Sequence, residues 1–147
     1  MKLLKDKKFK TCYYRADDIK EWVYENPTYV GNPTTNTALI SVQETKLYNK
    51  KFSEVIGNVL QDVVSYKNRS KELTTYKSTY FFEEGSISFN LNFDGQTTDR
   101  RVNTGEYIFD IINGTGKYLD VKGYVLFEVL SDTTRKVRFY SNKISPF

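Results

Sequence analysis

The chain is 147 residues long, which fits a single domain with one hydrophobic core, and it carries a formal net charge of +4. Because it contains no histidine, Ser-His-Asp and Cys-His nucleophile systems, histidine zinc sites and histidine haem ligation are excluded. Its single cysteine, Cys12, excludes an intramolecular disulfide and a CxxC site, so acid or base chemistry has to come from Asp, Glu, Lys, Tyr or this one thiol.

The positive charge is concentrated at the start of the chain. Residues 1–10 (MKLLKDKKFK) hold five lysines and one aspartate, which equals the whole net charge. We interpret this segment as a solvated, mobile terminus, with a localisation or polyanion-binding arm as the alternative. A nucleic-acid module carries its positive charge on the folded body, so we do not expect nucleic acid as a partner.

The same segment holds no recognisable leader. Leu3 and Leu4 form the only aliphatic pair before Lys5, far short of the roughly 7 to 15 apolar residues of a signal peptide. No run in the chain approaches the ~20 apolar residues of a membrane span. We therefore expect an intracellular, cytoplasmic protein without a membrane partner.

Residues 16–25 (ADDIKEWVYE) predict a short helix. Its two aspartates can accept hydrogen bonds from the first free amides, and Ile19, Trp22 and Val23 share one helical face. We expect Trp22 to plug a barrel end or pack on the outside of the barrel, with stacking on a ligand as the alternative. The Pro-, Thr- and Asn-rich stretch that follows is a loop.

After this loop the apolar residues recur at every second position, which is typical of strands. In residues 38–44 (ALISVQE) we expect Ala38, Ile40 and Val42 to face the interior, and Ser41 and Gln43 to face outward. Residues 52–66 predict a second strand with Gly57 inside it, where a bulge is expected.

Short turn signals separate the next strands. Residues 68–70 predict a turn, residues 73–84 a strand rich in Thr, Tyr and Phe, and Glu84-Gly85 the next reversal. Residues 86–94 (SISFNLNFD) alternate strictly between polar and apolar side chains, which indicates a half-buried antiparallel strand.

The last part of the chain predicts three more strands. Residues 107–112 form one, and residues 113–116 (NGTG) are expected to make a tight turn because Gly and Asn tolerate positive φ. Strands then follow at residues 119–129 and 135–140.

These elements predict a mainly β fold, an antiparallel closed barrel of about eight strands with a short N-terminal helix. Residues 1–36 are expected to pack on the barrel as a basic segment, helix and loop, and residues 37–147 to form the barrel itself.

Residues 111–118 (IINGTGKY), followed by the glycine of residues 122–124 (KGY), resemble the hairpin of the allene oxide cyclase and dirigent superfamily. In that hairpin a strand ends in Gly-Gly-Thr-Gly, and here Asn113 stands at the first glycine. Residues 84–87 (EGSI) also resemble the start of a preceding strand in the family. The similarity covers roughly residues 37–130.

The resemblance implies an eight-stranded barrel, commonly a homotrimer, whose apolar lumen is open at one end and holds or folds a reactive apolar molecule. It implies no metal and no organic cofactor. The turn residues that carry it have a structural role in either case: Gly114, Thr115, Gly116 and Gly123.

Candidate site residues have to be sought outside that motif. Glu44 follows the predicted inward face of residues 38–44 in phase, so it is expected near a barrel mouth, as an acid or base or as a solvated strand end. Tyr107 and Asp110 flank the strand that leads into the hairpin, and Arg101 lies just before it. Arg101 and Tyr107 at a mouth can hold a carboxylate or an enolate oxygen; alternatively these charges form a surface ion pair or blunt a sheet edge.

Tyr76 and Tyr80 share one face of their predicted strand. They can line a ligand-binding lumen with their hydroxyl tips, or simply pack between strands.

Two functional hypotheses follow. The first is a barrel that binds a small apolar ligand in its lumen, with a cyclase, isomerase or dirigent-like role. The second is a non-enzymatic barrel, filled with aromatic side chains, that assembles through its outer faces as a homodimer or homotrimer. Polyanion binding by the Lys-rich start is a third hypothesis.

Overall fold

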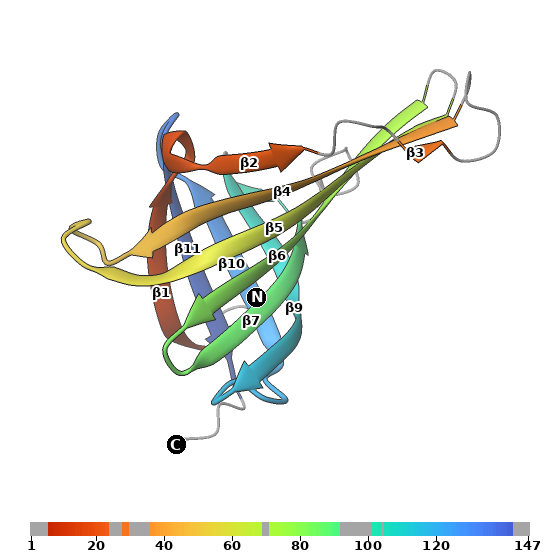
Figure 1. The fold of residues 1–147 in the computed structure, drawn as a ribbon. Helices are drawn as coiled ribbons and strands as arrows, with labels where there is room; N and C mark the ends of the chain where they lie inside the picture. Colours follow the sequence, from red (N-terminus) through yellow and green to blue (C-terminus); the bar gives the residue numbers. More distant parts are fainter. Residues whose placement is uncertain are drawn as a thin grey trace.

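The computed structural model describes residues 6–23, 28–29, 36–68, 71–91, 101–103 and 105–142, and it is built almost entirely of β-strands (Figure 1). The strands are β1 (Lys7–Arg15), β2 (Lys20–Val23), β3 (Thr28–Tyr29), β4 (Asn36–Tyr48), β5 (Val55–Asn68), β6 (Lys71–Phe82), β7 (Gly85–Leu91), β8 (Arg101–Asn103), β9 (Glu106–Gly116), β10 (Gly123–Val129) and β11 (Thr134–Ser141). One 3₁₀ turn, η2 (Ala16–Asp18), separates β1 from β2.

Eight of these strands form a closed antiparallel barrel in the order β1-β11-β10-β9-β7-β6-β5-β4, and β4 returns to β1. The predicted closed barrel of about eight strands is therefore confirmed. Strands β2 and β3 pair with β4, and β8 pairs with β9, so these short strands lie at the margin of the barrel. The long strands β4, β5 and β6 project beyond the barrel on the side of β3 (Figure 1).

The expected mobile tail is wrong from Lys7 onward, because this part of the chain is strand β1 of the barrel wall. It pairs with β11 along its length and with β4 at Tyr13. The lysines in its first half gave no apolar alternation, so the sequence did not indicate a strand. In β1 only Cys12 and its two tyrosine neighbours are buried. The barrel therefore draws on residues from both sides of position 37.

The predicted N-terminal helix is also wrong. The described chain contains no α-helix: after η2, Ile19 is already extended at φ −67° and ψ 127°, and Lys20–Val23 pair with β4. A helix of ten residues is marginal on its own, whereas the free edge of β4 offers inter-strand hydrogen bonds. Trp22 lies on the outside, as one of the two expected placements, and its side chain is 54% exposed.

The side chains of β4 point in the opposite directions from those predicted: the face expected to point inward points outward. Leu47 is fully buried, and Thr45 and Ser41, which are in phase with it, also point inward. The register with β5 requires this, because Thr45 lies opposite the buried Val59 and opposed residues share a face. The predicted inward residue Ile40 is exposed. The apolar spacing of residues 38–44 gave the wrong face because Leu47, which fixes it, lies beyond that window.

One predicted turn lies where the sequence placed it, but another does not. The reversal at Glu84-Gly85 is confirmed, and the ladder is irregular beside Gly57 as expected. Of the turn predicted at residues 68–70, residues 69–70 lie outside the described residues, and β5 and β6 pair on either side of it. Residues 113–116, in contrast, are the last residues of β9 and pair with β7, so the turn comes later in the chain.

Two of the glycines permit close backbone approach. A Cβ on Gly114 would strike the carbonyl oxygen of Tyr118 in the turn after β9, and a Cβ on Gly123 would strike that of Tyr140 in β11. Gly116 has a φ of +62°, which also favours glycine. Gly114 and Gly116 therefore shape the turn after β9, and Gly123 lets β10 lie close to β11.

Aromatic rings fill the middle and the β6–β7 hairpin end of the barrel. Tyr80 stacks on Phe89 with ring centroids 5.2 Å apart, and Phe139 contacts both rings edge-on. The core also contains aliphatic side chains from every barrel strand except β1, which contributes Cys12 and Tyr14, and β6, which contributes Tyr80 and Phe82. Burial of this apolar surface is the main force that holds the barrel closed.

Candidate functional site

A layer of polar side chains crosses the barrel interior next to the aromatic core. Tyr14, Gln61, Ser78 and Tyr80 come from β1, β5 and β6, and each is less than 9% exposed. Their positions follow from strand alternation, because each is in phase with buried residues of its own strand. Four hydrogen-bonding side chains therefore meet inside an otherwise apolar barrel.

Two hydroxyls of this layer have no hydrogen-bond partner in the part of the chain that the structure describes. The Tyr80 hydroxyl and the Ser78 Oγ are buried without one, and both residues are completely inaccessible. Tyr14 lies close enough to Tyr80 for the two phenols to perturb each other's pKa, but the geometry falls short of a hydrogen bond. A buried polar group without a partner lowers the free energy of unfolding by about 1–3 kcal/mol. The layer therefore contains hydroxyl groups that can still donate a hydrogen bond.

Burial also fixes the protonation of these groups. Desolvation raises the pKa of Tyr14 to about 12, although the nearby Arg135 and the contacts with Gln61 and Tyr80 oppose the shift. Desolvation likewise raises the pKa of Tyr80 and of the Cys12 thiol. At neutral pH the phenols are therefore hydrogen-bond donors rather than bases, and the thiol is protonated and inert.

Larger polar side chains lie between this layer and the η2 end of the barrel. Arg135 lies opposite Tyr14 in the β1–β11 register, and its Nη1 donates to the carbonyl oxygens of Ser131 (2.8 Å) and Thr134 (3.3 Å). Tyr76 and Tyr107 are half-buried and pack against the core. The interior thus becomes more polar and more accessible toward η2.

The opposite end of the barrel is closed. Lys10 forms an ion pair with Glu84 at 3.2 Å, and its ammonium lies 4.6 Å from the centroid of the Phe82 ring. A hydrogen bond from its own backbone and the Lys10 contact lower the pKa of Glu84, although partial desolvation opposes this. Tyr118 packs edge-on against Phe82. Side chains therefore cover this end of the barrel interior.

The structure brings some of the predicted site residues together. Tyr76 and Tyr80 do share the inward face of β6, with Ser78 between them. Arg101 is the register partner of Tyr107 in the β8–β9 pair. Asp110 is exposed, and its neighbour Phe109 rather than Asp110 points into the core.

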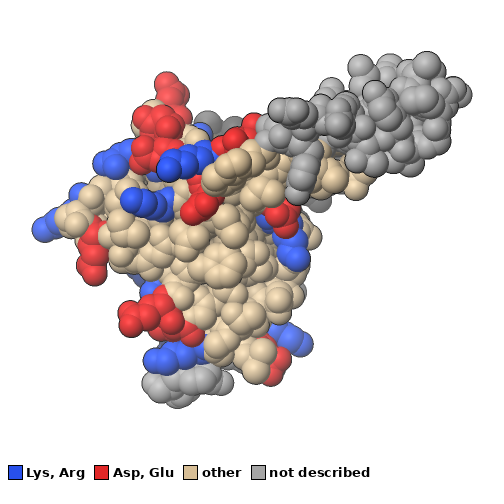
Figure 2. All heavy atoms as spheres, in the orientation of Figure 1, with Lys and Arg blue, Asp and Glu red and all other residues tan. Residues whose placement is uncertain are grey.

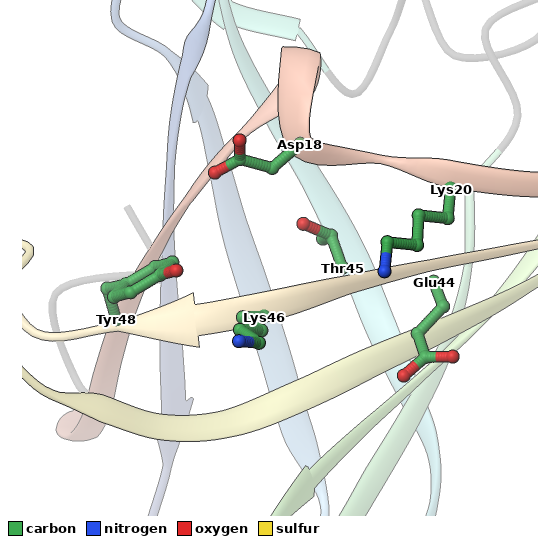
Figure 3. Close-up of a pocket in the computed structure, with 6 residues that line it drawn as sticks. All are labelled: Asp18, Lys20, Glu44, Thr45, Lys46 and Tyr48. Atoms are coloured by element: carbon green, nitrogen blue, oxygen red, sulfur yellow. The ribbon is translucent and has the colours of Figure 1, made fainter.

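Glu44 does not reach the interior. It points away from the barrel axis and lines a surface pocket of about 250 Å³ between η2, β2 and β4 (Figure 3). The other lining residues are Asp18, Lys20, Thr45, Lys46 and Tyr48. Glu44 does not lie at the barrel mouth as predicted, because the face of β4 that was predicted to point inward points outward.

The sequence missed the residues Tyr14, Gln61, Ser78 and Arg135. Their strands alternate polar and apolar residues imperfectly, so a polar residue on the inward face looks like an outward one. For Ser78 and Arg135, the signal that identifies the face is the phase shared with Tyr80 and Phe139, respectively.

Two searches of the described residues gave negative results. Within residues 6–23, 28–29, 36–68, 71–91, 101–103 and 105–142, no group of three or more Cys, Asp or Glu side chains is arranged to hold a metal ion. In the same part of the chain, no helix is long and apolar enough to span a membrane.

Neither a family model nor a curated protein matches the sequence. Solved structures do match the fold, which is a dirigent-like β-barrel. The pterocarpan synthase dirigent protein PsPTS1 is 15% identical, with a TM-score of 0.57 over 96% of this chain and 97% of that one. The related GePTS1 is 13% identical, with a TM-score of 0.54 over 96% and 92%.

A third similar structure is a pyocyanin demethylase, 16% identical, with a TM-score of 0.51 over 88% of this chain and 99% of that one. These identities establish a shared fold and no shared activity. The dirigent part of the resemblance is therefore supported at the level of the fold, and the allene oxide cyclase part stays a prediction.

Proposed function

We propose that the barrel binds a small, mostly apolar molecule at the η2 end of its interior, and holds it or steers its conversion by shape. The observation that carries this proposal is that the Tyr80 and Ser78 hydroxyls, on the same inward face of β6, are both buried with no hydrogen-bond partner among the described residues. A ligand oxygen that accepts a hydrogen bond from this layer would remove the cost of the unpaired groups.

The chemistry of the layer defines the ligand further. Tyr14 and Tyr80 remain protonated, so they donate hydrogen bonds and suit a carbonyl or ether oxygen. The surrounding rings, such as Phe89 and Phe109, suit an aromatic or otherwise flat apolar body. In a reaction, such donors stabilise negative charge that develops on the oxygen, so a cyclase, isomerase or dirigent-like role is compatible with them.

The structural neighbours support the same class of ligand. The names pterocarpan synthase and pyocyanin demethylase both denote small-molecule chemistry carried out by proteins with this barrel. Both neighbours match the present chain over nearly its whole length.

A thermal-shift series tests the proposal. The panel is a set of one- to three-ring aromatic ketones, each with its parent hydrocarbon as the matched control. Ketones are expected to raise the Tm of the native protein by mass action, and the hydrocarbons to do so much less. Tyr80→Phe is expected to weaken ketone binding about tenfold and leave the hydrocarbons unaffected. The proposal fails if no ketone stabilises the protein, or if Tyr80→Phe leaves ketone binding unchanged.

A second candidate function is assembly without catalysis, as a homodimer or homotrimer. Two observations favour it: aromatic side chains fill much of the interior, and charged side chains are sparse over the middle of β5, β6 and β7 (Figure 2). On this outer face, hydroxyl pairs such as Thr79–Ser88 (2.9 Å) satisfy each other, and Phe81 is 39% exposed.

Sedimentation velocity distinguishes the two functions. If assembly is the function, the wild-type protein is an oligomer that Phe81→Lys dissociates, and the ketone panel has no effect. Leu130→Lys is the control, because Leu130 is an exposed leucine that follows β10, and β10 pairs with β9 and β11 rather than with β5, β6 or β7. A monomeric wild-type protein would contradict the assembly function.

A further inference from the structure

The barrel wall is incompletely paired where β4 returns to β1. On this edge of β4, residues 41–44 pair with β2, and β1 supplies a partner only for Tyr48. In the described pairings, residues 45–47 therefore have no strand beside them on this side. The surface pocket of about 250 Å³ lies at this gap, between β4 and the η2 turn (Figure 3).

Four charged side chains of both signs line the pocket without neutralising one another. Asp18, Lys20, Glu44 and Lys46 form no ion pair and no side-chain hydrogen bond among the described residues, even though Lys20 and Glu44 are register partners. In Figure 3 the two carboxylates lie on opposite sides of the Lys20 ammonium. Their charges sum to zero, so the pocket favours a ligand that is neutral overall and carries both signs.

The floor of the pocket supplies an independent observation. Thr45 is only 6% exposed, and its Oγ1 is buried without a hydrogen-bond partner. A ligand in the pocket would provide the partner that no described residue provides. Tyr48 forms one wall with its ring, which also contacts Phe52.

We propose that this pocket is a second binding site and that it takes a small zwitterion of the α-amino acid class. The ligand carboxylate would accept hydrogen bonds from the Thr45 hydroxyl and a lysine ammonium, and the ligand ammonium would pair with Asp18 or Glu44. The volume suits such a molecule, because it lies just below the roughly 300 Å³ at which pockets for larger organic ligands begin.

This site differs from the interior layer in the side chains that line it. Thr45 points inward from β4 at the gap in the wall, and none of the residues that line the pocket belongs to the interior layer. A zwitterion bound here would contact both β2 and β4 and stabilise the seam of the barrel, which is the place where β4 meets β1.

The test is a calorimetric and thermal-shift titration of the full chain with each common L-amino acid. For each amino acid that binds, its deaminated acid and its decarboxylated amine are the matched controls. At least one amino acid is expected to raise the Tm, and both single-charge analogues are expected to bind at least about tenfold more weakly.

Variants locate the site. Thr45→Val keeps the shape of the side chain and is expected to weaken binding about tenfold, and Lys46→Gln to weaken it as well. Lys77→Gln, on the outer face of β6, is the control that leaves binding unchanged. The proposal is overturned if no amino acid binds, if a single-charge analogue binds equally well, or if Thr45→Val binds like the wild-type protein.

Discussion

Tyr13 of β1 and Tyr48 of β4 form the register pair by which the described strands close the barrel into a ring. Phe52, in the β4–β5 turn, covers this pair: its ring centroid lies 6.0 Å from that of Tyr13 and 5.4 Å from that of Tyr48. The Arg15 guanidinium lies 3.9 Å from the Phe52 centroid on the same cluster. Closure therefore depends on side-chain packing at least as much as on backbone pairing.

Phe52→Ala is expected to lower the free energy of unfolding by about 2–3 kcal/mol, because it removes the ring that covers the seam. Phe52 also has a φ of +55°, which is unfavourable for a residue with a Cβ. Phe52→Gly should therefore be about 1 kcal/mol less destabilising than Phe52→Ala, although it removes the same contacts. Urea denaturation of both variants measures the loss of the ring contacts and the relief of the backbone strain separately. Equal stability of the wild-type protein and Phe52→Ala would show that the cluster does not hold the seam.

Two adjacent residues of β6 provide a matched pair for the buried polar layer. Ser78 points inward and its hydroxyl has no partner, whereas Thr79 points outward and its hydroxyl pairs with Ser88 at 2.9 Å. Ser78→Ala is expected to raise the free energy of unfolding by about 1 kcal/mol, because it removes an unsatisfied buried group. Thr79→Val should lower it by about 1 kcal/mol, since it leaves Ser88 unpaired. If Ser78→Ala destabilised the protein in urea denaturation, its hydroxyl would have a partner after all.

Gly123 is expected to tolerate no side chain. A Cβ at this position would strike the backbone carbonyl of Tyr140 in the neighbouring strand, so Gly123→Ala has to push β10 and β11 apart. The expected loss of stability is about 2–3 kcal/mol. Lys122→Ala, one residue earlier and exposed, is the control and should change stability by less than about 0.5 kcal/mol. Similar melting temperatures for the two variants would contradict the close approach.

Much of the fold was predictable because alternation is a local signal. The strict pattern of residues 86–94 predicts strand β7, and the apolar and aromatic residues near the end of the chain predict β11. Turn residues fixed the reversal at Glu84-Gly85. Strand β1 was missed because lysines occupy its first half, and only its partner strand shows that they belong to a sheet.

The candidate site was harder to predict because non-local pairing determines it. The inward direction of β4 depends on its register with β5, which sets Thr45 opposite Val59. Glu44 was therefore assigned to the wrong side of the wall. Tyr14 and Gln61 meet only because β1 and β5 are both folded into the same barrel, and no local pattern links residues so far apart in the chain.

The pH dependence of stability follows from the absence of histidine and from the buried acids. No side chain with an ordinary pKa titrates between about pH 5 and 8, so the Tm should be nearly constant there. Burial raises the pKa values of Cys12, Tyr14 and Tyr80 above their ordinary values of 9.0 and 10.0. Above these values the unfolded chain loses protons that the folded chain keeps, so stability should fall from about pH 9 toward pH 12. The pKa of Glu84 is lowered, so its contribution to the stability of the fold is present above about pH 4.5 and is lost as the pH falls further.

Tyr14→Phe should flatten the alkaline fall in Tm in a series of melting curves and leave the acid limb unchanged. An alkaline limb that is the same in Tyr14→Phe and the wild-type protein would show that this phenol does not contribute to it.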